Sequence, residues 1–94
     1  MFSVTLNSDN TINLTGRFDA SQADAAKKEF NRIDQSAVVD FSGLDYISSA
    51  GLGVLLMTQK RLMEKGHKLK LVNMNNHVRE VFKYARFDFI FEIE

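Results

Sequence analysis

The chain has 94 residues, of which 45% are hydrophobic, and its 12 basic and 12 acidic residues give no net charge. This length favours a single domain spanning 1–94, the apolar content excludes a disordered chain, and the balanced charge argues against nucleic acid as a partner. With no cysteine, no visible secretory leader and no apolar run long enough to cross a bilayer, we expect a soluble, cytoplasmic protein without disulfides, thiolate metal sites or direct membrane insertion.

The first half of the chain predicts a hairpin, a helix and a buried strand. Apolar and polar residues alternate on both sides of a turn at 7–10, which is typical of a β-hairpin over 2–15 that ends at Gly16. Apolar residues then recur at helical spacing over about 21–33. Residues 37–41 form a short apolar strand of the kind that is buried on both faces, and a short polar loop leads on to two serines.

The second half predicts a long helix, a strand, a third helix and a last strand. The long helix covers about 49–65, and Gly66 is well placed to end it. A strand over 69–72 follows, one of the asparagines at 75–76 opens the third helix, and alternation over 87–93 predicts a final strand. The inner stripe expected for the long helix consists of Leu52, Leu55, Leu56, Leu62 and Met63.

The predicted order of elements is β-β-α-β-α-β-α-β, which indicates an α/β fold. Short connections between alternating strands and helices favour right-handed crossovers, so we expect a mixed, largely parallel central sheet with helices packed on it. In such sheets, functional residues tend to lie beyond the carboxyl ends of the strands. We therefore expect Asp40 and Ser42 to lie at one corner with the pair Ser48 and Ser49.

The two serines at the start of the long helix have two interpretations. A hydroxyl and free backbone N–H groups at a helix N-terminus can bind an anion, and such a serine can also be phosphorylated by another protein. Alternatively, either serine serves only as the N-cap, since serine is among the preferred capping residues. The nearby Gly51 and Gly53 either leave the backbone open to a partner or permit close packing of the helix on the sheet.

The other polar residues leave similar alternatives open. Asp40 can accept N–H groups where a strand ends, or it can hold a serine hydroxyl or a metal ion brought in with a nucleotide. Asp19 fits a helix cap, and His67 and His77 fit solvated surface positions. We find no catalytic triad, no dinucleotide fingerprint and no phosphate loop, so we expect neither enzymatic activity nor a bound cofactor or metal.

Four segments resemble the STAS domain of anti-sigma factor antagonists. Asp-Phe-Ser at 40–42 and Ile-Ser-Ser-Ala-Gly-Leu at 47–52 are similar to the central motif of that family. Gly-Arg-Phe-Asp-Ala-Ser at 16–21 is similar to its Gly-x-x-Asp segment, and the strand and helix over 71–82 fit its later elements. The resemblance covers nearly the whole chain and agrees with the predicted order of elements.

The resemblance implies a regulator that works by partner switching and is not an enzyme. The unphosphorylated protein would bind an anti-sigma factor that is also a serine kinase. Phosphorylation of Ser49 would break that complex, and a cognate phosphatase would restore it. Independently of the resemblance, we expect the free protein to be a monomer. We expect the partner to pack over Gly51 and Leu52. The partner-binding or phosphosite-supporting residues implied by the resemblance are Asp19, Asp40, Ser42, Ser48, Gly51 and Leu52.

The chain departs from the family pattern beside the expected phosphosite. Ser48 stands where many members have aspartate, and Ala50 precedes the glycine. This departure motivates an alternative, a constitutive STAS-domain accessory subunit of a membrane transport complex that is not phosphorylated. A third hypothesis is a small nucleotide-binding or nucleotide-hydrolysing protein that uses the same corner for phosphate, although the chain has no phosphate-loop lysine.

Overall fold

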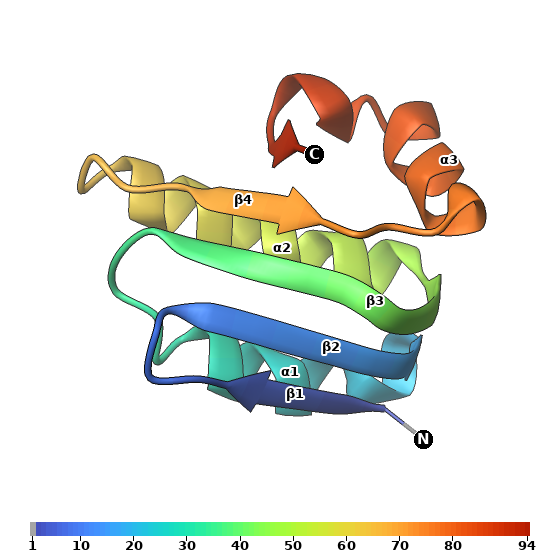
Figure 1. Cartoon of the computed structure of the whole chain (residues 1–94), viewed down its shortest axis with the longest axis horizontal. Coiled ribbons are helices and arrows are strands. Elements are labelled where there is room, and N and C mark those ends of the chain that lie inside the picture. The colour runs from blue at the N-terminus through green and yellow to red at the C-terminus, as the bar shows by residue number, and fades with distance from the viewer. Residues whose placement is uncertain (1) are drawn as a thin grey trace.

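A five-stranded mixed sheet in the order β1-β2-β3-β4-β5 forms the centre of the computed structural model, which describes residues 2–94 (Figure 1). The strands are β1 Ser3–Leu6, β2 Thr11–Phe18, β3 Ala37–Ile47, β4 Leu69–Val72 and β5 Glu92–Ile93. The helices are α1 Ala23–Phe30, α2 Ser49–Met63 and α3 Asn76–Tyr84, with short 3₁₀ turns at Ala20–Gln22 and Phe87–Phe89. Only β1 and β2 are antiparallel, and the other neighbouring strands are parallel, which confirms the expected α/β class with a largely parallel sheet.

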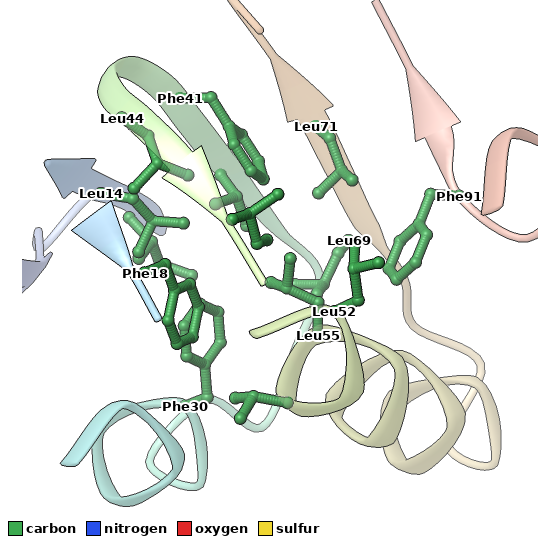
Figure 2. Close-up of a cluster of buried hydrophobic side chains, with 14 of the residues drawn as sticks. Leu14, Phe18, Phe30, Phe41, Leu44, Leu52, Leu55, Leu69, Leu71 and Phe91 are labelled. Atoms are coloured by element: carbon green, nitrogen blue, oxygen red, sulfur yellow. The ribbon is translucent and has the colours of Figure 1, made fainter. Parts of the chain in front are cut away.

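The hydrophobic core lies between the sheet and helices α1 and α2, which lie behind it in Figure 1. Alternate residues of β3 are buried, namely Ala37, Val39 and Phe41, because successive side chains of a strand point to opposite faces. Figure 2 shows Leu52 and Leu55 of α2 beside these strands, within the same cluster. The opposite face of the sheet carries mostly polar side chains.

Two strands are longer than the sequence predicts. The prediction that Gly16 ends β2 is wrong, because the chain takes a positive φ of 84° there, shifts register and continues in the strand to Phe18. The short polar loop expected after 41 is also wrong, because β3 continues to Ile47 in parallel pairing with β2. Gly43 permits this pairing, since a Cβ there would lie 2.7 Å from Thr15 Cγ2.

The ends of the helices and the last strand also differ from expectation. The helix expected over 21–33 ends at Phe30 and is preceded by a 3₁₀ turn, and Met63 is exposed instead of lying in the inner stripe of α2. The strand expected over 87–93 is a 3₁₀ turn followed by only two strand residues. The alternation of phenylalanines suggested a strand, but the structure uses these residues differently. Phe87 and Phe91 both pack on the Phe82 ring, whereas Phe89 is exposed.

Candidate functional site

The carboxyl ends of β2 and β3 meet at one corner, which we call the serine corner and define as Asp19, Ser48 and Ser49. Phe18 is paired with Ile47 at the end of the parallel ladder, and the Ser48 amide donates to the Phe18 carbonyl at 2.9 Å. Asp19 follows Phe18 directly in the chain. The parallel register therefore places Asp19 next to the start of α2.

Ser48 and Ser49 differ in what their hydroxyls do. Ser48 has an extended backbone and is the N-cap of α2, and its hydroxyl oxygen accepts the Gly51 amide at 3.3 Å. Ser49 is the first residue of α2 and is exposed, and its hydroxyl makes no hydrogen bond within residues 2–94. The capping role therefore belongs to Ser48, and the Ser49 hydroxyl is accessible to another molecule.

Two charged residues, Arg17 and Asp19, flank Phe18 at the end of β2. Asp19 caps the 3₁₀ turn by accepting the Ser21 amide at 3.0 Å. The Ser21 hydroxyl, with a smaller contribution from the charge of Arg17, lowers the pKa of Asp19 below its usual value. The Arg17 guanidinium lies 4.4 Å from the centre of the Tyr46 ring. Sequence analysis missed this pair, because it depends on the register between β2 and β3.

The structure does not bring Asp40 and Ser42 to the serine corner. Because β3 continues to Ile47, Asp40 lies in the middle of the strand, and its position between two core residues directs its side chain to the polar face of the sheet. Its carboxylate accepts the Ser42 amide at 2.9 Å and the Asn73 side-chain amide at 3.2 Å. The Ser42 amide, followed by the Asn73 amide, holds the pKa of Asp40 below its usual value.

Gly51 and Leu52 face the core of the chain itself. Leu52 is only 7% exposed, and Gly51 is buried against Phe18 and Ile47. The expectation that a partner packs over these two residues is therefore wrong. Of the two roles expected for Gly51, the structure supports close packing of the helix on the sheet. An added Cβ there would lie 2.9 Å from Ile47 Cγ1.

The exposed side of the first turns of α2 carries no charge. It consists of Ser49, Ala50, Gly53 and Met57, of which Met57 is 57% exposed. An added Cβ at Gly53 would find no atom within 4 Å, so this glycine is not required for packing. The first charged residue along this side is Lys60. An uncharged surface thus extends from the Ser49 hydroxyl along the helix.

The two glycines of α2 predict opposite effects of the same substitution. Gly51→Ala is expected to lower the free energy of unfolding by about 1–3 kcal/mol, because the new methyl group overpacks the core against Phe18 and Ile47. Gly53→Ala is expected to raise it by about 0.5–1 kcal/mol, because alanine is the better helix former and the space is open. Urea unfolding of both variants measures this, and equal stability of the two would contradict the assigned packing.

The described part of the chain offers no obvious metal site. Within residues 2–94, no three His, Cys, Asp or Glu side chains are grouped so that they could hold a metal ion. None of the helices in that range is both long and apolar enough to cross a membrane. What the corner does contain is an accessible Ser49 hydroxyl at the N-terminus of α2 and the Asp19 carboxylate.

Comparison with known proteins gives a consistent result at the level of sequence. The family model described as Mlab, STAS domain matches residues 3–92. BtrV of Bordetella bronchiseptica, described as a candidate anti-sigma factor antagonist, is 43% identical over 60 residues, which are 64% of this chain and 52% of that protein. This similarity therefore spans about half the length of BtrV.

Solved structures share the fold over nearly the whole chain. An anti-sigma factor antagonist from Mycobacterium paratuberculosis matches with a TM-score of 0.83 at 20% identity, covering 99% of this chain and 83% of that one. The Bacillus cell fate determinant SpoIIAA, solved in its phosphorylated form, matches with a TM-score of 0.72 at 16% identity, covering 100% and 91%. At these identities the likeness concerns the fold.

The family match begins at the first residue of β1 and reaches the first residue of β5, so it includes every helix and the serine corner. The strand order and the helices agree with the solved antagonists. The resemblance inferred from the motifs is thereby confirmed. This chain belongs to the STAS domain family.

Proposed function

We propose that this chain is a partner-switching regulator that antagonises an anti-sigma factor in the bacterial cytoplasm. Its unphosphorylated form binds an anti-sigma factor that is also a serine kinase, and the sigma factor is thereby freed. Phosphorylation of Ser49 releases the kinase, and a cognate phosphatase returns the chain to its binding form. The chain itself catalyses no reaction in this cycle.

The separation of roles between the two adjacent serines supports this proposal most strongly. Ser48 already caps α2, so the exposed Ser49 hydroxyl is not needed for the helix. A kinase can therefore modify Ser49 without removing the cap. The match of the fold to SpoIIAA, which has been solved in a phosphorylated form, is consistent with a fold that tolerates such a modification.

The uncharged side of α2 supports a partner interface beside Ser49. A partner that packs along Gly53 and Met57 would enclose the Ser49 hydroxyl at the edge of the contact. Phosphorylation adds about 1.5 to 2 negative charges at neutral pH. Within the free chain this charge is favourable by roughly 0.3–1 kcal/mol, because it lies at a helix N-terminus. Beneath a partner it would have to be desolvated, so it opposes binding without unfolding the domain.

Of three residues expected to support partner binding, Asp19 lies at the serine corner, whereas Asp40 and Ser42 do not. Asp19 lies at the serine corner with its carboxylate ionised, and it is available to a basic group of the partner. Asp40 and Ser42 belong to the polar face of the sheet, so they would contribute only if the partner also reached that face. We therefore assign the core of the interface to Ser49, Asp19 and the exposed side of α2.

The constitutive accessory subunit of a transport complex remains the second candidate. It is favoured by one observation, the presence of Ser48 where many family members carry aspartate. Ser48 supplies a cap but no carboxylate for a kinase to recognise. In that case the same side of α2 would bind a subunit of the transporter permanently.

Substitution of Ser49 in the native organism distinguishes partner switching from a constitutive accessory subunit. Ser49→Ala cannot be phosphorylated, so partner switching predicts constant antagonism and a sigma-dependent set of transcripts that no longer responds to conditions. Sequencing of total RNA from the wild type and the variant measures this. Unchanged transcripts and unchanged responses would contradict partner switching and favour the accessory subunit.

A further inference from the structure

The free edge of β1 differs from the opposite edge of the sheet, and we propose that it pairs with the same edge of a second copy of this chain. The resulting dimer has a two-fold axis at Thr5 and a continuous sheet running through both copies. This inference does not depend on the proposed function, because β1 lies outside the serine corner. It replaces the expectation of a monomer when free.

The β1 edge lacks the charged side chains and prolines that often prevent edge-to-edge association. Residues 2–8 contain no charged side chain and no proline. The opposite edge, β5, has only two residues, and ion pairs of 2.6 Å from Lys68 to Glu92 and of 2.7 Å from Lys70 to Glu94 surround it. Short strands and charges are the common means of protecting an edge. One edge is therefore protected and the other is open to another strand.

The backbone of β1 has the right alternation for pairing with itself. The Asn7 amide donates to the Thr11 carbonyl at 2.9 Å, so the backbone N–H and C=O groups of Asn7 face β2. Because these groups alternate in direction along a strand, those of Val4 and Leu6 face the free edge. With the axis at Thr5, Val4 of each copy lies opposite Leu6 of the other. Each such pair exchanges two backbone hydrogen bonds in an antiparallel ladder.

The side chains on both faces of this edge also fit a second copy. On the core face, Phe2, Val4 and Leu6 are only partly buried although they pack against the core, so apolar area remains to be covered. On the polar face, Thr5 of one copy meets Thr5 of the other, and cross-strand threonine pairs are favourable. An identical neutral strand thus complements this edge on each face.

Charges on α1 favour the same antiparallel arrangement. α1 contacts β1 and lies behind β1 and β2 in Figure 1, so the axis brings the two copies of this helix side by side in opposite directions. Asp24 lies in the first turn, and Lys27 and Lys28 lie in the last turn, all exposed. The first turn of one helix then faces the last turn of the other. There Lys27 and Lys28 outnumber Glu29, whose carboxylate pairs with Arg32 at 3.2 Å.

Sedimentation velocity and size-exclusion chromatography with light scattering, each over a range of concentrations, test this dimer. The wild-type chain is expected to reach the mass of two copies as its concentration rises into the micromolar range. Thr5→Lys is expected to remain a monomer, because two lysines would lie one strand spacing apart, about 5 Å. The exposed position of Thr5 leaves the core intact, which circular dichroism verifies.

Thr15→Lys provides the matched control, because Thr15 is also an exposed threonine of the polar face but lies on β2, one strand further in. Thr15 pairs with Ser3, so its two copies would be three strand spacings apart across the sheet and four residues apart along the strands. Their separation of roughly 20 Å exceeds the Debye length of about 8 Å at physiological ionic strength. This variant is expected to dimerise like the wild type. A wild-type chain that stays monomeric at all concentrations, or a Thr5→Lys variant that still dimerises, would overturn the proposal.

Discussion

Ser49→Asp is expected to weaken binding to the anti-sigma partner by at least about tenfold while changing the melting temperature little. Tenfold weaker binding corresponds to about 1.4 kcal/mol, which is less than the usual cost of enclosing an uncompensated charge in an interface. The free domain tolerates the carboxylate, because negative charge at the first residue of α2 is favourable to the helix. Isothermal titration calorimetry with the purified partner, together with thermal unfolding, measures both quantities.

Two serine variants serve as controls for this result. Ser49→Ala is expected to bind as tightly as the wild type, because the Ser49 hydroxyl makes no hydrogen bond within the described chain. Ser48→Ala is expected to lose about 1 kcal/mol of stability, because it removes the cap of α2. Equal affinity of Ser49→Asp and Ser49→Ala for a proven partner would contradict the interface proposed here.

Gln59→Leu is expected to lower the free energy of unfolding by about 2–4 kcal/mol. The Gln59 side chain is 2% exposed and joins three elements, since its oxygen accepts the Leu69 amide at 2.8 Å and its nitrogen donates to the Ile90 carbonyl at 3.0 Å. Leucine has a similar size but removes both bonds, of which the one to the Leu69 amide is buried and the one to the Ile90 carbonyl is partly buried. A buried backbone group left without a partner costs about 1–3 kcal/mol. Urea unfolding monitored by circular dichroism measures the change.

The neighbouring residue supplies the control for this second prediction. Lys60 is exposed on the same helix, so Lys60→Leu is expected to change the stability by no more than about 0.5 kcal/mol. The comparison separates the lost hydrogen bonds from any general effect of leucine on α2. A loss below about 1 kcal/mol in Gln59→Leu would show that water or other groups replace the bonds of this side chain.

The element order was predictable from the sequence because each segment carries its own periodicity. The spacing of apolar residues in α2 and the alternation in the hairpin are local features, and so is the positive φ of Gly66 after the last turn of α2. The length of β3 was not predictable, because residues 42–46 are held in the strand by pairing with β2. The register of two distant strands decides that pairing.

The candidate site was predictable only in part, for the same reason. The serines at 48–49 could be found from their place before an amphipathic helix, but their different roles depend on which hydroxyl reaches the Gly51 amide. Asp40 was assigned to the corner because β3 was expected to end beside it. The role of Gln59 was missed, because a polar residue in a helix gives no local sign that two backbone groups surround it.

Ser49 is the residue of this chain that we propose to be phosphorylated. Intact mass spectrometry of the protein isolated from its own cells, with fragmentation across residues 40–60, tests it most directly, under growth and under stress. We expect a fraction of the protein to carry one phosphate on Ser49 and none on Ser48, and we expect this fraction to change with conditions. A protein that is unmodified under all conditions, or phosphorylated at Ser48, would contradict it.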